Sequence, residues 1–169
     1  MLANGEGVAQ NQGEAVKWFR KAAEQGYASA QNDLGVMLFT GMGVAQNQGE
    51  AVKWFRKAAE QGYVLAQYSL GVMLDTGEGV AQNQVEAAKW YRLAAEQGYA
   101  PAQFNLGLMH AKGEGVAQNF SQSYIWLSLA TAQDSKYREA RDIVAKKLTP
   151  QQLQRAQEQA SAWKPKTER

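Results

Sequence analysis

Apolar side chains along this 169-residue chain recur every 36 residues, and within each period they follow two helical patterns. In the first period the first pattern comprises Ala15, Val16, Trp18, Phe19, Ala22 and Ala23. This spacing places its members on one face of a helix. The second pattern, which comprises Ala30, Leu34, Met37 and Leu38, predicts another helix from about Ala28 to Thr40. Each period therefore predicts a helix–turn–helix pair.

The period is also visible in the letters themselves. Residues 7–27 are GVAQNQGEAVKWFRKAAEQGY, and the same 21 letters return at 43–63. A near copy occupies 79–99, and a more divergent copy starts at Gly115. A single helix pair has only one apolar stripe to bury, so stacked neighbours are needed to form a continuous core. The sequence thus predicts an all-α solenoid of 36-residue repeats.

Polar and glycine positions mark where the helices begin and end. Asn11 followed by Glu14 resembles a capping box, in which the asparagine oxygen accepts a first-turn N–H and the carboxylate reaches back. The pair recurs as Asn47/Glu50, Asn83/Glu86 and Asn119/Gln122. Gly26, Gly62 and Gly98 stand where a left-handed C-cap is expected. Gly35, Gly71 and Gly107 recur inside the second helix, where glycine is unfavourable, so we expect close helix packing there.

The two ends differ from the repeats. Met1–Gly7 aligns with Met37–Gly43, so we expect the chain to start midway through a second helix, as in a fragment or a truncated array. From Ser135 an amphipathic helix is predicted to Leu148, followed by Thr149 as N-cap and Pro150 at the first helical position. We therefore expect repeats over 1–133, a capping helix pair over 134–163 and a frayed tail over 164–169.

The repeat carries a family resemblance. The pattern A-x-x-x-L-G-x-M-x-x-x-G-x-G-V followed by E-A-x-K-W-(F/Y)-R-x-A-A-E-Q-G resembles the Sel-one-like repeat family, relatives of the tetratricopeptide repeats, from Met1 to about Gln133. The C-terminal LTPQQLQRAQ is similar to endings in that family. The resemblance implies a right-handed α/α superhelical solenoid whose concave side recruits proteins. It also favours a bacterial periplasmic or secreted location over a cytoplasmic one.

Composition narrows the range of functions only slightly. Apolar residues make up 45% of the chain and charged residues 20%, as in globular proteins. The net charge of +2 is too small by itself to indicate nucleic acid or an anionic membrane. The chain has no cysteine, which excludes disulfides, thiolate nucleophiles and cysteine-ligated metals. No window approaches the roughly 20 apolar residues that a membrane-spanning helix needs.

Candidate catalytic chemistry is sparse. His110 is the only histidine and takes the register of Leu38 and Leu74, so we interpret it as a core substitution and expect no metal site. Glu14 and Glu24 recur with the helix, which capping and solvation explain as well as acid–base chemistry does. The repeated tryptophans fall within the apolar stripe and are predicted to be core. We expect neither an enzyme nor a cofactor.

Candidate binding residues lie on both helices of the repeat. The first helices carry a regularly spaced set of cations, the basic ladder, which comprises Lys17, Arg20, Lys53, Arg56, Lys89 and Arg92. It is either a solvated face or a surface for an acidic peptide. Second-helix positions vary most between copies, notably Asn32/Tyr68/Phe104, so Tyr68 and Phe104 are also candidates. The first helices differ mainly at Gly49/Val85 and Lys57/Leu93.

The leading functional hypothesis is a scaffold or adaptor that binds a protein or peptide segment in the concave groove, and the basic ladder suggests an acidic segment. RNA binding is an alternative, because helical-hairpin repeats can each bind one base. The near-identical first helices argue against such a code, and we expect no nucleic-acid partner. The other alternative is a peptidoglycan- or β-lactam-binding exported repeat protein, for which the sequence offers no nucleophile.

Overall fold

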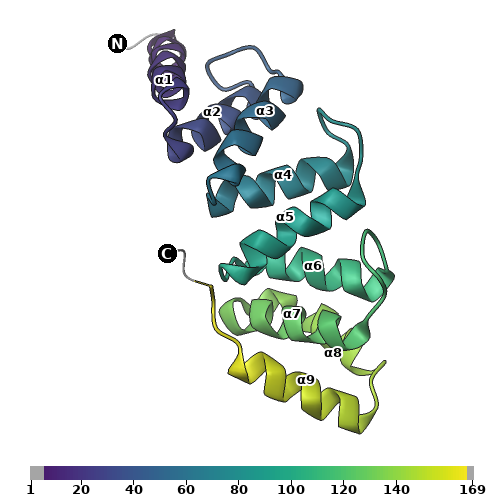
Figure 1. Ribbon diagram of the computed structural model, residues 1–169. Coiled ribbons are helices and arrows are strands. Elements are labelled where there is room, and N and C mark those ends of the chain that lie inside the picture. Colours follow the sequence, from purple (N-terminus) through teal and green to yellow (C-terminus); the bar gives the residue numbers. More distant parts are fainter. Residues whose placement is uncertain (1–5, 167–169) are drawn as a thin grey trace. The chain divides into compact units, whose positions relative to one another are not determined.

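The computed structural model describes the backbone of residues 6–166 and the side chains of residues 11–166. Every regular element within these residues is a helix, which confirms the predicted all-α class (Figure 1). In chain order the helices are α1 (Glu6–Glu24), α2 (Ala28–Thr40), α3 (Gln48–Glu60), α4 (Val64–Thr76), α5 (Gln84–Glu96), α6 (Ala100–Lys112), α7 (Phe120–Gln133), the short 3-10 helix η1 (Ser135–Tyr137), α8 (Arg138–Ala145) and α9 (Pro150–Ala162). The expected partial helix at the start of the chain falls mainly on residues 1–5, which lie outside the described residues.

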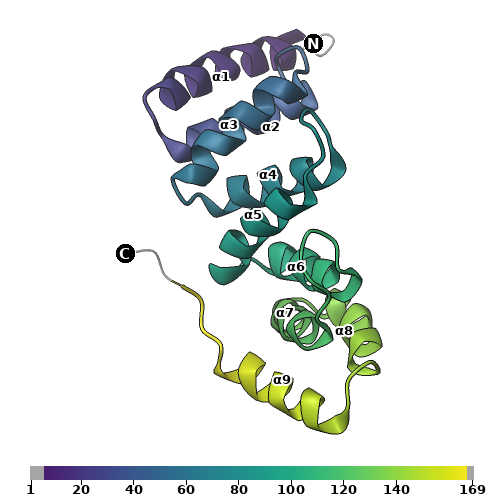
Figure 2. The ribbon, with the colours of Figure 1, turned by 45° about the vertical axis from the view of Figure 1, so that its right-hand side comes forward.

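The chain divides into two compact units, residues 1–82 and residues 83–169. In the first unit α2 packs against both α1 and α3, and α4 packs against α3 (Figure 2). In the second unit α6 packs against both α5 and α7, and α7 in turn contacts α8 and α9. The predicted boundary between repeats and capping helices, at residue 133, lies inside the second unit and stays a prediction.

The second helix of each repeat has the predicted bounds. α2 runs from Ala28 to Thr40, and Gly41 follows it in the left-handed conformation with φ of 77°. The N–H of Gly41 donates to the carbonyl of Met37 at 2.8 Å, which satisfies one of the free carbonyls at the helix end. The first helices are also followed by left-handed glycines, at Gly26, Gly62 and Gly98, as predicted.

The start of the first helix differs between copies. Asn47, Asn83 and Asn119 are N-caps as predicted, whereas Asn11 lies inside α1, which begins at Glu6. In the later copies the loop before the cap is tied to the preceding second helix. Asn47 N–H donates to Leu38 O at 2.8 Å, and Gln46 Nε2 donates to Phe39 O at 2.7 Å. The described residues provide no such partner before α1, and the same letters there continue as helix.

Only one half of the predicted capping box forms in the repeats. The Asn47 side chain accepts from the N–H of Glu50 at 3.0 Å. The reciprocal bond is not made, because the Asn47 N–H already donates to Leu38 O and the Glu50 carboxylate bonds elsewhere. A complete box forms at Thr149 and Gln152, where both bonds are present.

The prediction that every repeat tryptophan is core is correct for Trp54 and Trp126, each 8% exposed. Trp90 is half-buried, and the prediction is wrong for Trp18, which is 69% exposed. The same 21 letters therefore bury the tryptophan on α3 and leave it exposed on α1.

The glycines inside the second helices allow close packing, as predicted. A Cβ at Gly35 would lie 2.8 Å from the ring of Phe55 on α3, and one at Gly107 would lie 2.8 Å from Leu127 Cγ on α7. Both distances are well inside van der Waals contact. The missing side chain therefore lets Phe55 and Leu127 reach the helix backbone.

A second group of glycines fixes the loops. Gly79 has φ of 70°, and a Cβ there would lie 2.6 Å from the carbonyl carbon and oxygen of Gln48. Gly43 stands in the same relation to Gln12, and Gly115 to Gln84. Each loop therefore passes against the backbone of the preceding first helix, at a separation that excludes any side chain.

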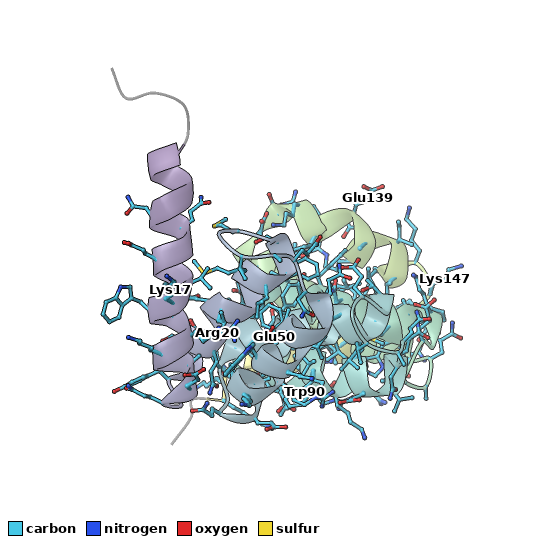
Figure 3. The ribbon with its side chains drawn as sticks, turned by 90° about the horizontal axis from the view of Figure 1, so that it is seen from above. Lys17, Arg20, Glu50, Trp90, Glu139 and Lys147 are labelled. Atoms are coloured by element: carbon cyan, nitrogen blue, oxygen red, sulfur yellow. The ribbon has the colours of Figure 1, made fainter. Side chains whose placement is uncertain are left out.

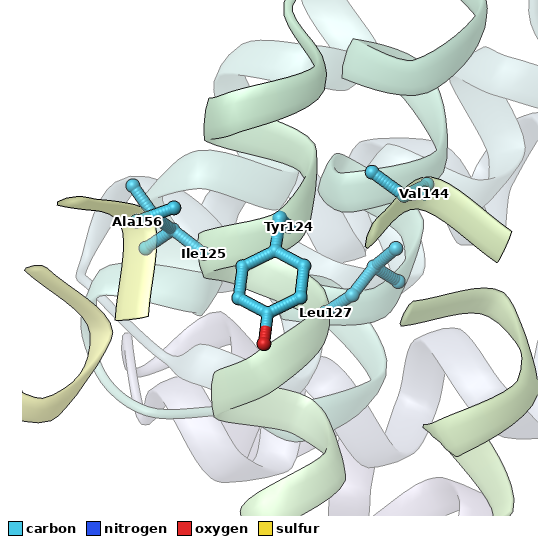
Figure 4. Close-up of a cluster of buried hydrophobic side chains, with 5 residues drawn as sticks. All are labelled: Tyr124, Ile125, Leu127, Val144 and Ala156. Atoms are coloured by element: carbon cyan, nitrogen blue, oxygen red, sulfur yellow. The ribbon is translucent and has the colours of Figure 1, made fainter. Parts of the chain in front are cut away.

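The C-terminal helices pack on α7 through a cluster of buried apolar side chains in the second unit (Figure 4). Its members are Tyr124, Ile125, Leu127, Val144 and Ala156. The helix expected over 135–148 is broken. Asp134 accepts from the N–H of Lys136 at 3.0 Å and starts η1, and α8 then ends at Ala145.

The tail expected to fray from Lys164 is held in place as far as Lys166. The N–H of Lys166 donates to the carbonyl of Glu96 at 2.7 Å, and its ammonium lies 2.8 Å from the Glu96 carboxylate. The prediction of a frayed tail is therefore wrong for 164–166, and residues 167–169 lie outside the described residues.

His110 on α6 is 7% exposed, which agrees with its interpretation as a core substitution for leucine. Its Nδ1 lies 3.4 Å from Ala117 O, and its Nε2 is buried without a hydrogen-bond partner. Burial lowers the pKa of His110, and the charge of Arg92 adds to this effect. Both effects favour the neutral form of the ring in the folded chain.

We predict that Gly79→Ala lowers the free energy of unfolding by about 2 kcal/mol or more, because the left-handed backbone and the contact with Gln48 both oppose a side chain. Gly49→Ala is the matched control. Gly49 is helical and exposed, and a Cβ there would make only ordinary contacts, so alanine is expected to raise stability by up to about 0.5 kcal/mol. Urea unfolding followed by circular dichroism measures both. Equal stability of the two variants would contradict the account of the loop.

We predict that stability falls as the pH drops below the ordinary His110 pKa of 6.5. The unfolded chain takes up a proton there that the folded chain resists, so protonation favours unfolding. His110→Leu should remove this dependence and raise stability at acidic pH, since it also removes an unpaired buried nitrogen. Urea unfolding midpoints measured above and below pH 6.5 test this effect. The same dependence of the midpoint on pH in the wild type and in His110→Leu would refute it.

Candidate functional site

The first-helix face of the first unit is organised around Glu50. Its Oε1 accepts from Arg20 Nη1 at 2.8 Å and from the indole Nε1 of Trp54 at 3.3 Å. Figure 3 shows Arg20 extending from α1 toward Glu50. The bond from Arg20 lowers the pKa of Glu50 below its ordinary value, with a smaller contribution from Trp54. The ion pair joins α1 to α3, so Arg20 has a structural partner.

An open hollow of about 670 Å³ lies beside Trp54 in the first unit. Its lining consists of Asn47, Gly49, Glu50, Lys53, Trp54, Lys57 and Gly79. Lys57 Nζ lies 4.4 Å from the centre of the Trp54 ring, a cation–π contact, and both lysines are exposed. The hollow therefore presents two ammonium groups beside an aromatic ring.

The second unit has a matching hollow of about 440 Å³ beside Trp90. It is lined by Asn83, Val85, Glu86, Lys89, Trp90 and Leu93, which stand in the same register as the residues of the first hollow. Trp90 Nε1 again donates to the glutamate four residues before it, at 3.3 Å from Glu86 Oε1. The same surface feature is thus built once in each unit.

The two hollows differ in chemistry at two positions. Val85 replaces Gly49 and is 56% exposed, and Leu93 replaces Lys57 and is 43% exposed. The second hollow is therefore more apolar than the first and keeps one lysine, Lys89. The sequence comparison found both substitutions but did not place them in a site, although variation between otherwise identical copies is the signal that marks them.

The residues of the basic ladder differ in exposure and in what they contact. Lys17, Lys53 and Lys89 are exposed, and only the latter two line a hollow. Arg56 is half-buried and engaged in an interaction of its own. Arg92 is exposed, because the residue at the register of its expected partner is the uncharged Gln122.

The second-helix candidates lie in different surroundings. Tyr68 is half-buried and lines an apolar pocket of about 240 Å³ formed by α2, α3 and α4, together with Val36, Phe39, Phe55, Ser69, Val72 and Met73. Phe104 stacks on Tyr137, with ring centroids 4.7 Å apart, and packs within the second unit. Packing accounts for Phe104, whereas Tyr68 borders open space.

Among the described residues, no three histidine, cysteine, aspartate or glutamate side chains gather as a metal site would require. No described helix has the length and apolar character needed to cross a membrane. The recurring carboxylate at Glu50 is occupied by Arg20 and Trp54. What the arrangement offers chemically is charge and an aromatic edge for binding.

Solved structures resemble the chain over most of its length. A protective antigen of uropathogenic Escherichia coli, c5321, which has the SLR fold, is 40% identical with a TM-score of 0.81, covering 88% of this chain and 32% of its own. A Sel1 repeat protein from Oxalobacter formigenes is 32% identical with a TM-score of 0.70, covering 80% of this chain and 59% of its own. This chain therefore spans about a third and about three fifths of those two proteins.

Helicobacter pylori cysteine-rich protein B is 21% identical with a TM-score of 0.59, covering 78% of this chain and 94% of its own, and supports the fold alone. A comparison with curated proteins finds no match. The model of the Sel1 repeat matches four times, at residues 1–27, 28–63, 64–99 and 100–135. Together with the helix pairs, these matches identify the architecture as an α/α solenoid, and the chain belongs to the Sel1 repeat family.

Proposed function

We propose that this chain is a protein-interaction scaffold that holds an extended segment of a partner protein along its first-helix face. Sel1 repeats are generally protein-interaction scaffolds. That the occupied face is the concave one stays a prediction. The observation that carries the proposal is the recurrence of one hollow, built on the same register beside Trp54 and beside Trp90.

The first hollow favours an acidic segment. Lys53 and Lys57 are exposed and stand one turn apart on α3, so a carboxylate in the hollow would meet both ammonium groups. Electrostatic complementarity of this kind selects partners and accelerates their association. Glu50 does not cancel the attraction, because Arg20 already neutralises it.

The second hollow favours a segment with an apolar side chain. Val85 and Leu93 flank Trp90 and expose much of their surface to solvent, and Lys89 stands between them. Burying such surface against a partner contributes about 25 cal/mol per Å². The two hollows thus support different contacts, which is what selective recognition by near-identical repeats requires.

The proposal assigns the chain no catalytic role. The carboxylates that recur with the repeat serve packing or lie on exposed helix faces, as Glu50 and Glu24 illustrate. A general acid or base needs a perturbed pKa at a site where substrate can reach it. Glu50 has a lowered pKa, but the side chains that lower it also occupy its carboxylate.

We predict that random peptides selected for binding to the chain are enriched in aspartate and glutamate. Peptides selected by phage display on the wild type should lose at least about fivefold in affinity for Lys53→Glu/Lys57→Glu, since reversing two exposed charges costs around 1 kcal/mol or more. Lys146→Glu/Lys147→Glu is the matched control, because it makes the same charge change at exposed positions of the second unit. Equal weakening by both variants would exclude the first hollow.

We also predict that Val85→Gly/Leu93→Lys gives the second hollow the binding properties of the first. Both side chains are largely exposed, so the fold should be retained. An acidic peptide that binds once to the wild type should bind twice to this variant, because Lys89 and the new lysine then form a second pair. Isothermal titration calorimetry measures the stoichiometry. A single site in the variant would mean that the hollow residues do not determine binding.

A further inference from the structure

The last described residues of the chain lie as an extended segment on the second unit. After α9 the backbone becomes extended at Trp163, with φ of −69° and ψ of 142°, and the segment leaves the helix (Figure 2). The Trp163 ring meets Trp126 edge-on, with centroids 6.3 Å apart. Pro165 then lies against Gly98, its Cγ 3.5 Å from where a Cβ would stand. Trp163 and Pro165 of the tail thus both pack against repeat residues of the second unit.

Lys166 completes the contact at the end of α5. Its N–H donates to Glu96 O at 2.7 Å, and its ammonium lies 2.8 Å from Glu96 Oε2. A carboxylate in the last turn of a helix is unfavourable, because the helix dipole is negative there, whereas a cation is favourable. Lys166 therefore offsets the charge of Glu96 and satisfies a free carbonyl at the helix end.

The three residues that Trp163, Pro165 and Lys166 contact in this way are repeat residues. Glu96, Gly98 and Trp126 correspond, 72 residues earlier, to Glu24, Gly26 and Trp54, with identical residue types. The backbone agrees as well: α1 ends at Glu24 as α5 ends at Glu96, and φ is 96° at Gly26 and 91° at Gly98. The first unit therefore contains a second copy of the surface on which the tail lies.

A neighbouring glutamine contact also recurs. Gln133 Nε2 donates to Gln103 Oε1 at 3.0 Å in the second unit, and Gln61 Nε2 donates to Gln31 Oε1 at 2.7 Å in the first. The second donor bond differs: Gln133 also donates to Gly98 O at 2.9 Å, whereas Gln61 donates to Lys57 O at 3.3 Å. The equivalence of the two surfaces rests on the shared glutamine contact as well as on sequence register.

The copy in the first unit is open at Gly26 and Tyr27, whereas Trp54 is buried. A Cβ at Gly26 would meet nothing within 4 Å, and Tyr27 is 62% exposed, whereas its counterpart Tyr99 is half-buried. One difference lies over the tryptophan. Lys57 covers the Trp54 ring, where the fourth repeat has Leu129 and Trp126 meets Trp163. An incoming aromatic ring would contact Trp54 beside the Lys57 side chain and gain a cation–π contact from its ammonium group.

We propose that Glu24, Gly26 and Trp54 form a binding site for an extended partner segment of the chemistry Trp-x-Pro-Lys, the chemistry of the chain's own residues 163–166. The aromatic ring lies on Trp54, the proline on Gly26, and the lysine pairs with Glu24. The occupant is a partner protein rather than a second copy, because each copy's tail is tethered to its own second unit, where its effective concentration is high. This inference rests on the proposed scaffold function and adds a specific ligand to it.

The test uses a synthetic peptide of residues 161–166, Ser-Ala-Trp-Lys-Pro-Lys, titrated into the ¹⁵N-labelled full chain and followed by NMR. The Gly26 and Tyr27 amides should shift to saturation, while the Gly98 amide stays in place because the tail covers it. The peptide with alanine for tryptophan should give no shift. Absence of a Gly26 shift, or an equal shift with the alanine peptide, would overturn the proposal.

Three variants separate this site from other causes. Glu24→Lys, at an exposed position, should weaken peptide binding at least about fivefold, whereas Glu14→Lys, equally exposed on α1, should not. Trp163→Ala should free the second unit, so that Gly98 then responds as well. Equal weakening by Glu24→Lys and Glu14→Lys would indicate nonspecific attraction and overturn the site.

The experiments also distinguish a partner segment from a second copy of the chain, and they separate this site from the scaffold proposal. If the Gly26 amide shifts when the unlabelled chain alone is concentrated, with formation of a dimer, the occupant is a second copy and the choice of partner is wrong. The scaffold proposal is tested by acidic peptides and by Lys53→Glu/Lys57→Glu. Lys53→Glu alone leaves Lys57 over Trp54 and should not weaken binding of the basic Trp-x-Pro-Lys peptide, so either proposal can fail without the other.

Discussion

Each long loop of the repeat passes against the backbone of the preceding first helix, at a separation that only glycine permits. In the first unit this contact joins Gly79 to Gln48, and Gly43 stands in the same relation to Gln12. Because the loop cannot move away without losing its bonds to the second helix, it fixes where the next first helix begins. Gly79 also lines the hollow beside Trp54. The packing constraint and the candidate binding surface therefore share a residue.

The sequence predicted the features that local chemistry determines. Apolar spacing predicts the helices α2, α4 and α6, and the need for a left-handed backbone predicts the glycine after each of them. Both signals lie within the sequence of a single repeat. The features it missed depend on neighbours. Asn47 is an N-cap where its N–H is bound to the preceding second helix, whereas Asn11 lies inside α1. Trp54 is buried, whereas Trp18 is exposed. Identical letters thus adopt different structures at the edge of the described array.

The candidate site was predicted less completely than the fold. Charge spacing located Lys53 and Lys89, but it could not distinguish them from Arg20, which is bound to Glu50. Nor could spacing show that the Glu50 carboxylate serves Trp54 rather than the helix cap. The substitutions Gly49/Val85 and Lys57/Leu93 were visible as letters. Only the geometry places both of them in the same hollow.

The two proposals also determine the direction in which a single segment would lie on the first unit. On the second unit the tail runs from Trp126 on α7 to Glu96 on α5, against the order of the repeats. A segment bound in the same way to the first unit would place its aromatic residue on Trp54 of α3 and its lysine at Glu24 of α1.

Residues that precede the aromatic ring would then lie nearest Lys57 and Lys53, which border the same tryptophan in the hollow. The favoured ligand for both surfaces together is therefore an acidic stretch followed by Trp-x-Pro-Lys. The ligand is acidic at its N-terminal end and basic at its C-terminal end. The surface matches it, with Lys53 and Lys57 at one end and Glu24 at the other. A segment with the opposite order of charges would place like charges together at both ends. The order of charged residues along the segment therefore gives the surface a selectivity that its amino-acid composition alone does not provide.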